Sequence, residues 1–360
     1  MSGRWRGLAA IVCMVTGFVP AHAAGPATPA GRLHALYESA WQRDMADDPL
    51  AATYYGDQRF NHRWPDIAPA TRERTLAADK QVLVDLAAIA SVGLSPVERL
   101  NQELFHRGYQ ARVAAARFQP EFFAFNAHDG PQTLNEVAES LPFDSVADYE
   151  TWLQRIEALP VFIDQTIAML RKAAAQKRTQ PRVLVERMLP LIALQIVDEP
   201  ARSPFYERFK EFPDGMAEAD RIRLRARATR LIAEQVVPAY RRYDSFLRNE
   251  YLRASRDTVG LWDTPDGAAF YAERVRFHTD STLTPDQIHE LGLVEVARIH
   301  VEMQKVMDEL GFKGSRQAFF DKLRNDPQFY FVTPDELFRA YVFAAKMIEP
   351  ELPKLFGKRA

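Results

Sequence analysis

Histidine spacing is the first feature of this sequence that bears on chemistry. His289 and Glu290 begin like the His-Glu-x-x-His motif, in which two histidines one helical turn apart hold zinc beside a glutamate base. Leu293 stands where the second histidine would be, and a leucine side chain has no lone pair for a metal. The other histidines after residue 23 are more than five positions from one another: His34, His62, His106, His128, His278 and His300. The sequence therefore predicts no metal ligand and no catalytic residue, and a zinc site assembled from distant side chains is the alternative that stays open.

The sequence also lacks the usual motifs of catalytic nucleophiles and of phosphate-binding loops. The chain has no Gly-x-Ser-x-Gly elbow, no Ser-x-x-Lys pair and no glycine-rich phosphate loop, and its one cysteine, Cys13, lies near the N-terminus. Paired carboxylates occur at Asp47-Asp48 and Asp198-Glu199. We interpret both pairs as structural, because acidic residues favour helix caps and turns.

Two stretches place aromatic rings beside polar groups, as a ligand cleft does. They run from Phe122 to Pro131 and from Asp266 to Thr279. The residues we expect to contact a substrate are Asn126, His128, Tyr271 and His278. The alternative is that these stretches hold core aromatics beside a loop histidine whose hydrogen bonds are satisfied.

The N-terminus has the three regions of a cleavable secretory signal. Arg4 and Arg6 precede an apolar run over 8–19, and a small-x-small triplet ends at Ala23. The run is shorter than the roughly 20 residues of a membrane-spanning helix, so we expect cleavage after Ala23 and no membrane anchor thereafter. The segment 1–23 is thus a predicted signal peptide, 24–30 is a predicted flexible leader, and the predicted location is the periplasm or the cell exterior.

Composition limits the partners and the means of stabilisation. Removing residues 1–23 leaves 44 basic against 48 acidic residues, a net charge of −4, and no cysteine. Such a balance argues against nucleic acid and anionic membrane surfaces as partners. Without thiols the chain cannot form disulfides, so its stability must come from a packed core.

The elements that would position any site are helices. Apolar residues recur at three- and four-residue spacing, and proline follows a capping residue at Asp48, Ser95, Thr284 and Thr333. Three of these caps are followed by the acidic or amide residue of a capping box, at Glu98, Gln287 and Glu336. The range 285–310 has one apolar stripe and a stop at Gly311, and Gly292 within the stripe predicts the close approach of a neighbouring helix.

The longest predicted helix spans 216–255. Pro238 lies inside it and is expected to kink or divide it, because proline lacks an amide hydrogen and its ring meets the preceding turn. Its early turns carry five arginines, namely Arg221, Arg223, Arg225, Arg227 and Arg230. We interpret them as a solvated face beside acidic residues, with an anion-binding face as the alternative.

No linker, repeat or low-complexity block interrupts the pattern, and the turn-rich stretch 257–267 is the nearest thing to a boundary. The sequence therefore predicts an all-α chain, an irregular multi-helix array in which 31–360 form a single helical domain.

A series of short motifs in a fixed order resembles one bacterial family. The motifs are Pro142-Phe143, Asp148-Tyr149-Glu150, Leu153, Arg155-Ile156, Pro160, Ile163-Asp164-Gln165, Thr179-Gln180-Pro181-Arg182, Ser203-Pro204-Phe205-Tyr206, Val237-Pro238-Ala239-Tyr240, Thr258-Val259-Gly260-Leu261, Phe277-His278-Thr279, Leu283-Thr284, Ile288 to Leu293, Gly311-Phe312-Lys313-Gly314 and Leu352 to Gly357. Together they resemble the N-terminal part of the proteins called domain of unknown function 885. That family is predicted to consist of helical zinc peptidases distantly similar to Taq-type carboxypeptidases.

The resemblance implies the N-terminal portion of a larger helical, zincin-like fold that hydrolyses peptides. The family's zinc motif, of the type His-Glu-x-x-Pro-Gly-His-His, and its Glu-Gly-Trp-Ala segment match no residue here. The resemblance thus implies zinc only for full-length members and no cofactor bound by this chain. Peptides, a missing catalytic segment or a partner chain are the expected partners, and apolar residues such as Leu352, Leu355 and Phe356 are expected to be left uncovered.

Three hypotheses of function follow. The first is an exported, catalytically incomplete relative of these zinc peptidases, most simply a fragment of one. The second is a helical peptide-binding or assembly protein without catalysis, and the third is a remnant that does not fold stably.

Overall fold

The computed structural model describes residues 28–123, 125–126 and 129–357, and this part of the chain is all-α. It contains no strand, and its one isolated bridge joins Pro181 to Arg256. The contacts divide the chain into two compact units, 1–279 and 280–360, each described below by itself. The single domain over 31–360 stays a prediction. The predicted signal, 1–23, lies outside the described residues, and α1 (Pro29–Asp47) begins within the expected leader, with Thr28 as its cap.

The predicted helix starts are confirmed. Side-chain caps at the expected residues begin α2 (Pro49–Tyr54), α4 (Pro96–Ala116), α11 (Pro285–Glu309) and α13 (Pro334–Ile348). The three expected capping boxes are present with Glu98, Gln287 and Glu336. Each box satisfies an amide at the cap and another in the first turn, groups that a helix cannot satisfy by itself.

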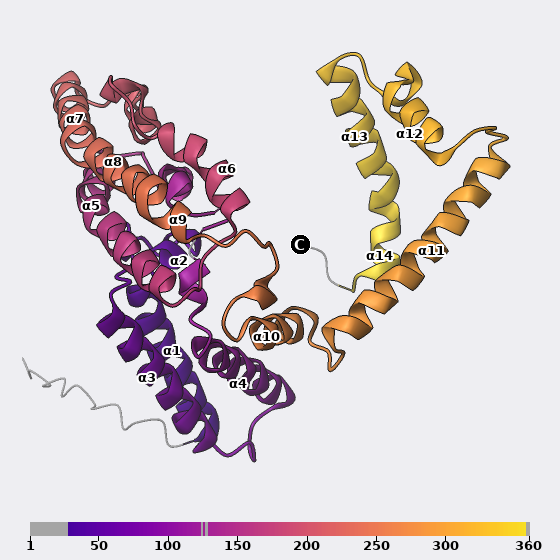
Figure 1. The fold of residues 1–360 in the computed structure, drawn as a ribbon, viewed down its shortest axis with the longest axis horizontal. Helices are drawn as coiled ribbons and strands as arrows, with labels where there is room; N and C mark the ends of the chain where they lie inside the picture. The colour runs from indigo at the N-terminus through magenta and orange to yellow at the C-terminus, as the bar shows by residue number, and fades with distance from the viewer. Residues whose placement is uncertain (1–27, 124, 127–128, 358–360) are drawn as a thin grey trace, which may run out of the picture. The chain divides into compact units, whose positions relative to one another are not determined.

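The first helices of unit 1 form a small bundle (Figure 1). Both α1 and α4 lie near α3 (Pro69–Ala87), and two small apolar clusters join the three helices. Leu33 of α1 and Leu86 of α3 are almost fully buried in one of them, and Ala40, Val82 and Tyr109 form the other. The bundle fixes the faces that α1 and α4 present to each other.

The main core of unit 1 surrounds α5 (Val146–Ala175). Its buried face includes Trp152, Ile156 and Ile163, which have no exposed surface. Helices α6 (Arg182–Ala193), α7 (Glu218–Leu231), α8 (Val237–Phe246), α9 (Leu252–Ala254) and α10 (Gly267–Thr279) complete the unit. α7 and α8 run beside α5 in Figure 1 and pack on it, so these three helices contribute a large part of the main apolar cluster.

The predicted long helix over 216–255 is present from Glu218 to Ala254, and Pro238 neither breaks nor ends it. Two π-helical segments, Ile232–Val236 and Leu247–Tyr251, interrupt its regular turns. Pro238 comes two residues after the first of them, as the second residue of α8. A wider turn leaves the carbonyl groups before the proline without the usual partner, so the missing amide hydrogen is accommodated.

Four of the five arginines at the start of this helix are held by acidic side chains or by backbone, in keeping with the predicted solvated face. Arg223 and Arg227 both donate to the Glu150 carboxylate on α5. Arg225 donates to the carbonyl oxygens of Phe209 and Lys210 at 3.0 and 3.1 Å.

Unit 2 contains α11, α12 (Arg316–Asn325), α13 and α14 (Leu352–Leu355). Gly311 has a φ of 65° and ends α11, as predicted. The close approach expected at Gly292 is wrong for the described residues, because a Cβ built there meets no atom within 4 Å. The expected exposure of Leu352, Leu355 and Phe356 is confirmed. No helix in the described residues has the length and apolarity that crossing a membrane requires.

Candidate functional site

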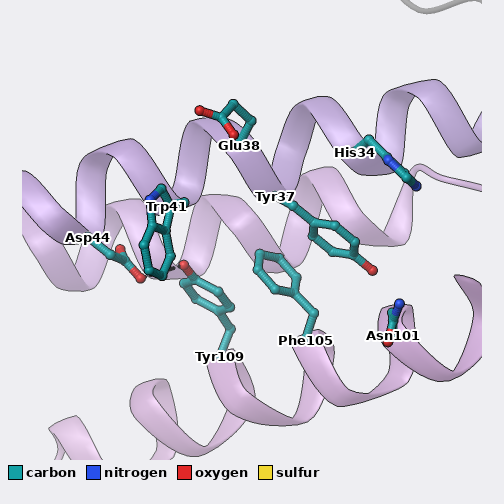
Figure 2. A pocket seen from close by; sticks show the side chains of 8 residues that line it. All are labelled: His34, Tyr37, Glu38, Trp41, Asp44, Asn101, Phe105 and Tyr109. Atoms are coloured by element: carbon teal, nitrogen blue, oxygen red, sulfur yellow. Dashed lines mark hydrogen bonds between the residues drawn. The ribbon is translucent and has the colours of Figure 1, made fainter. Parts of the chain in front are cut away.

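A groove of about 840 Å³ lies between α1 and α4 in unit 1 (Figure 2). Its lining residues are His34, Tyr37, Glu38, Trp41 and Asp44 from α1, and Asn101, Phe105 and Tyr109 from α4. Within each helix these positions are three or four residues apart, so each set lies along one face. The two faces lie opposite each other because α1 and α4 both pack on α3.

A continuous row of rings follows the length of the groove. The Tyr37 ring centroid lies 4.6 Å from that of Phe105, which lies 4.7 Å from that of Tyr109. His34 is 6.2 Å from Tyr37 at one end, and Trp41, 42% exposed, lines the other. Aromatic rings with a few polar groups among them are the usual lining of sites for small molecules and peptide side chains.

The Tyr37 hydroxyl is the polar group of this row without a hydrogen-bond partner in the described residues. Its oxygen is shielded from solvent, although the residue as a whole is half-buried. Burial, and next the charge of Glu98, raise the pKa of Tyr37, so the hydroxyl keeps its proton at neutral pH and can donate it in a hydrogen bond. Leaving such a group unpaired costs free energy, which a ligand acceptor would recover once the side chains that shield the hydroxyl move aside.

One end of the groove is closed by a charge-balanced network. Asp44 accepts hydrogen bonds from Arg43 at 2.6 Å, from Arg112 at 2.6 Å and from the Tyr109 hydroxyl at 2.8 Å. Both arginines also reach Oδ1 of Asp79 at 3.0 Å. Two carboxylates and two guanidinium groups thus neutralise one another, and they fix the Tyr109 ring in the groove wall.

Burial acts on the two carboxyl groups with different outcomes. It raises the pKa of Asp79, and the two arginines offset this only in part. For Asp44 burial also raises the pKa, but hydrogen bonds from Arg112 and Arg43 outweigh it, and the pKa is lowered. Burial and the hydrogen bond to Asp44 raise the pKa of Tyr109 to about 12, so Tyr109 remains a donor at neutral pH.

The sequence-predicted substrate residues lie elsewhere in unit 1. Asn126 is exposed, its backbone amide donates to the Asp129 carbonyl at 2.8 Å, and its side-chain oxygen accepts from the Asp129 amide at 2.9 Å. His128 lies outside the described residues. The buried Gln180 side chain holds the same segment by donating to the Phe125 carbonyl oxygen at 2.6 Å.

Tyr271 and His278 are both exposed on α10. Tyr271 contacts Trp262 edge to face, with 6.1 Å between ring centroids, and His278 contacts the neighbouring Phe277 ring. The two predicted stretches do meet, but through the buried Phe270, whose ring centroid lies 5.9 Å from that of Phe123. The roles of Asn126, His128, Tyr271 and His278 in substrate binding stay predictions.

The residues interpreted as structural behave as such. Asp48 caps α2 by accepting from the amides of Leu50 and Ala51, and Glu199 pairs with Arg202 one turn away. His289 is exposed on α11. A search of the described residues for three or more metal-binding side chains close together finds none.

The groove was not among the sites predicted from the sequence, although the spacing of its aromatic residues can be seen there. Tyr37 and Trp41, and likewise Phe105 and Tyr109, are aromatic pairs four residues apart. This spacing puts each pair on one helical face, but it does not say that the two faces meet.

Comparison with known proteins completes the description of the chain. The fold is similar to the crystal structure of a protein from Colwellia psychrerythraea that was assigned as a lipoprotein, with a TM-score of 0.82 and 20% sequence identity. The match covers 92% of this chain and 60% of that one, so the chain spans three fifths of the length of this relative. A search of curated proteins finds no match. The family model described as bacterial protein of unknown function (DUF885) matches residues 49–360, and the chain therefore belongs to the DUF885 family.

Proposed function

We propose that this chain is an exported protein that binds peptides in the groove between α1 and α4 and does not cleave them by itself. The observation that carries the proposal is the row of rings from Tyr37 to Tyr109, with an unpartnered hydroxyl among them. An extended peptide offers both complements, since its side chains pack on rings and its carbonyl oxygens accept hydrogen bonds.

The charges around the groove favour an uncharged or basic peptide segment. Asp44 and Asp79 are neutralised by their arginines, and Glu38, which accepts a 2.6 Å bond from Gln42, adds an exposed negative charge at the rim. A peptide rich in aspartate or glutamate would meet this carboxylate without gaining a free cation from the lining residues.

The experiment measures peptide affinity by the fluorescence of Trp41, which lines the groove. Short peptides with one aromatic side chain between glycines are titrated into the purified chain, and a matched series replaces the aromatic residue by aspartate. We expect saturable binding for the aromatic series and at least tenfold weaker binding for the acidic one. A Trp41→Phe variant identifies the source of the signal, and equal affinities for the two series would contradict the proposal.

The relation to zinc peptidases belongs to the same proposal. Its supports are the ordered motifs shared with a family predicted to be peptidases and the two fifths of the solved relative that lie beyond the match. In this view the chain supplies a substrate-holding helical scaffold, and a missing catalytic segment or partner chain supplies zinc and its ligands. Stoichiometric zinc with chelator-sensitive peptide hydrolysis by the purified chain would refute it. Broad, non-cooperative melting would instead favour the hypothesis of a remnant that does not fold stably.

A further inference from the structure

Unit 2 carries more exposed apolar surface than a free helical unit normally does. None of the 15 residues of α13 is buried, and Phe338, Tyr341 and Phe343 are each more than two thirds exposed. In α11, Met307 is the one buried residue among the 25. Soluble monomers rarely expose a continuous apolar patch larger than about 300–600 Å².

The pattern of α13 is that of a helix enclosed by protein. Its charged residues Asp335, Glu336, Arg339 and Lys346 fall on one side of the helix, and the rest of the circumference is apolar. A helix with so narrow a polar face is usually buried on its other sides. Its apolar residues are Leu337, Phe338, Ala340, Tyr341, Val342, Phe343, Ala344, Ala345, Met347 and Ile348.

α11 provides a second apolar face. The predicted stripe is exposed at Val296, Ile299, Val306 and Leu310. A shallow hollow of about 250 Å³ follows part of this stripe, where Ile299, Met303 and Val306 line it together with Phe319 and Phe320 of α12. A hollow of this kind between two helices receives side chains from a third helix.

The comparison with the solved relative indicates what covers these faces. The match leaves out 8% of this chain, so most of unit 2 belongs to the shared fold, and two fifths of the relative lie outside it. The few charges on these faces favour a partner that is itself apolar, and α11 and α12 present the hollow that a helix fits.

We propose that the apolar faces of α11 and α13 form a docking surface for an amphipathic helical segment, and that the two fifths of that relative outside the match contain such a segment. The segment lays its apolar side along α13 and into the hollow beside α11. This surface does not include the groove in unit 1. An experiment can therefore refute the docking proposal without refuting peptide binding in the groove.

Because Cys13 is the only cysteine in the sequence, maleimide labelling of single-cysteine variants tests the proposal. In a Cys13→Ser background, Tyr341→Cys reports on the apolar face of α13, and Arg339→Cys reports on its polar face. Each variant is made as the full chain alone and as the full chain with the relative's uncovered segment joined after residue 360 by a flexible linker. Labelling rates are measured together with mass by light scattering.

We expect Tyr341→Cys to label as fast as Arg339→Cys in the chain alone. With the segment joined, Tyr341→Cys labels about tenfold more slowly when the local segment concentration is about ten times its Kd, whereas Arg339→Cys changes little. A further Phe338→Glu substitution restores fast labelling.

Three results would overturn the proposal. An unchanged Tyr341→Cys rate in the joined protein shows that the segment does not dock. If the cysteine on the apolar face labels slowly in the chain alone and the mass is doubled, a second copy of the chain covers the surface. If it labels slowly at monomer mass, unit 1 covers the surface.

Discussion

The guanidinium of Arg155 lies over the indole ring of Trp64, 5.4 Å from its centroid, and the Trp64 ring nitrogen donates a 2.7 Å hydrogen bond to the Arg155 carbonyl oxygen. Arg155 is fully buried, and its Nη2 donates to Thr53 Oγ1 and to the carbonyl oxygens of Pro49 and Phe60. Burial lowers its pKa to about 10, which leaves it protonated at neutral pH. Arg155 thus joins α5 to α2 and to the short turn that ends at Phe60, by hydrogen bonds to neutral groups.

Arg155→Ala is expected to lower the free energy of unfolding by about 3 kcal/mol, because it leaves a cavity and unpaired buried oxygens. Arg155→Met keeps the length and removes a buried charge, so we expect a smaller loss than for alanine. Urea unfolding of the two variants measures the difference. An alanine variant as stable as the parent would show that the buried guanidinium contributes nothing.

Tyr37→Phe tests the unpartnered hydroxyl of the groove. Peptide affinity is expected to fall about three- to tenfold, the effect of losing one hydrogen bond, while stability stays unchanged or rises. The exposed Tyr330 of unit 2 supplies the control, since Tyr330→Phe removes a hydroxyl far along the chain from the groove residues. Equal affinities of the two variants would rule out a ligand contact at Tyr37.

The two carboxyl groups behind Tyr109 should respond to pH with opposite signs. The pKa of Asp44 is lowered from 3.8, so its stabilising contribution is full above pH 3.8 and is lost as pH falls through the lowered pKa. The destabilisation caused by Asp44→Asn should therefore shrink in acid. The pKa of Asp79 is raised from 3.8, so the parent gains stability as that group is protonated, and the destabilisation caused by Asp79→Asn should grow as pH falls toward 3.8. Denaturant unfolding of both variants between pH 3 and pH 7 measures the slopes, and parallel slopes would contradict the assignment.

Two glycines of unit 1 should respond to alanine in opposite ways. Gly130 has a φ of 148°, and a Cβ there would lie 2.6 Å from the Phe125 Cβ, so Gly130→Ala is expected to destabilise the chain by more than about 1 kcal/mol. Gly108 lies inside α4 with open space around it, and Gly108→Ala should stabilise by about 0.5–1 kcal/mol. Thermal melting of the pair checks both signs, and a stabilised Gly130→Ala would show that its Cβ does not clash with Phe125.

Features determined by residues close together in the chain could be predicted from the sequence. Features that depend on residues far apart in the chain could not. The cap at Ser95 and the stop at Gly311 are local, since one side chain or one φ angle decides them, and the structure has both where they were predicted. The groove is not local, because Tyr37 and Phe105 are 68 positions apart and meet through the packing of their helices on a third. Gly292 was misjudged for a related reason: a small residue permits close packing but does not supply the neighbour.

The two π-helical segments between α7 and α9 have a consequence for variation within this helix. A π turn holds one residue more than the α turn it replaces, so each segment behaves as a one-residue insertion absorbed without breaking the helix. Deleting one residue between Ile232 and Val236 would restore a regular turn and leave the later residues facing as they do now, whereas a regular turn that kept all five residues would rotate everything after it by about 100°. Tyr240 and Tyr243, now fully buried, would swing away from the core. The widened turn therefore determines which side chains in the second half of this helix face α5.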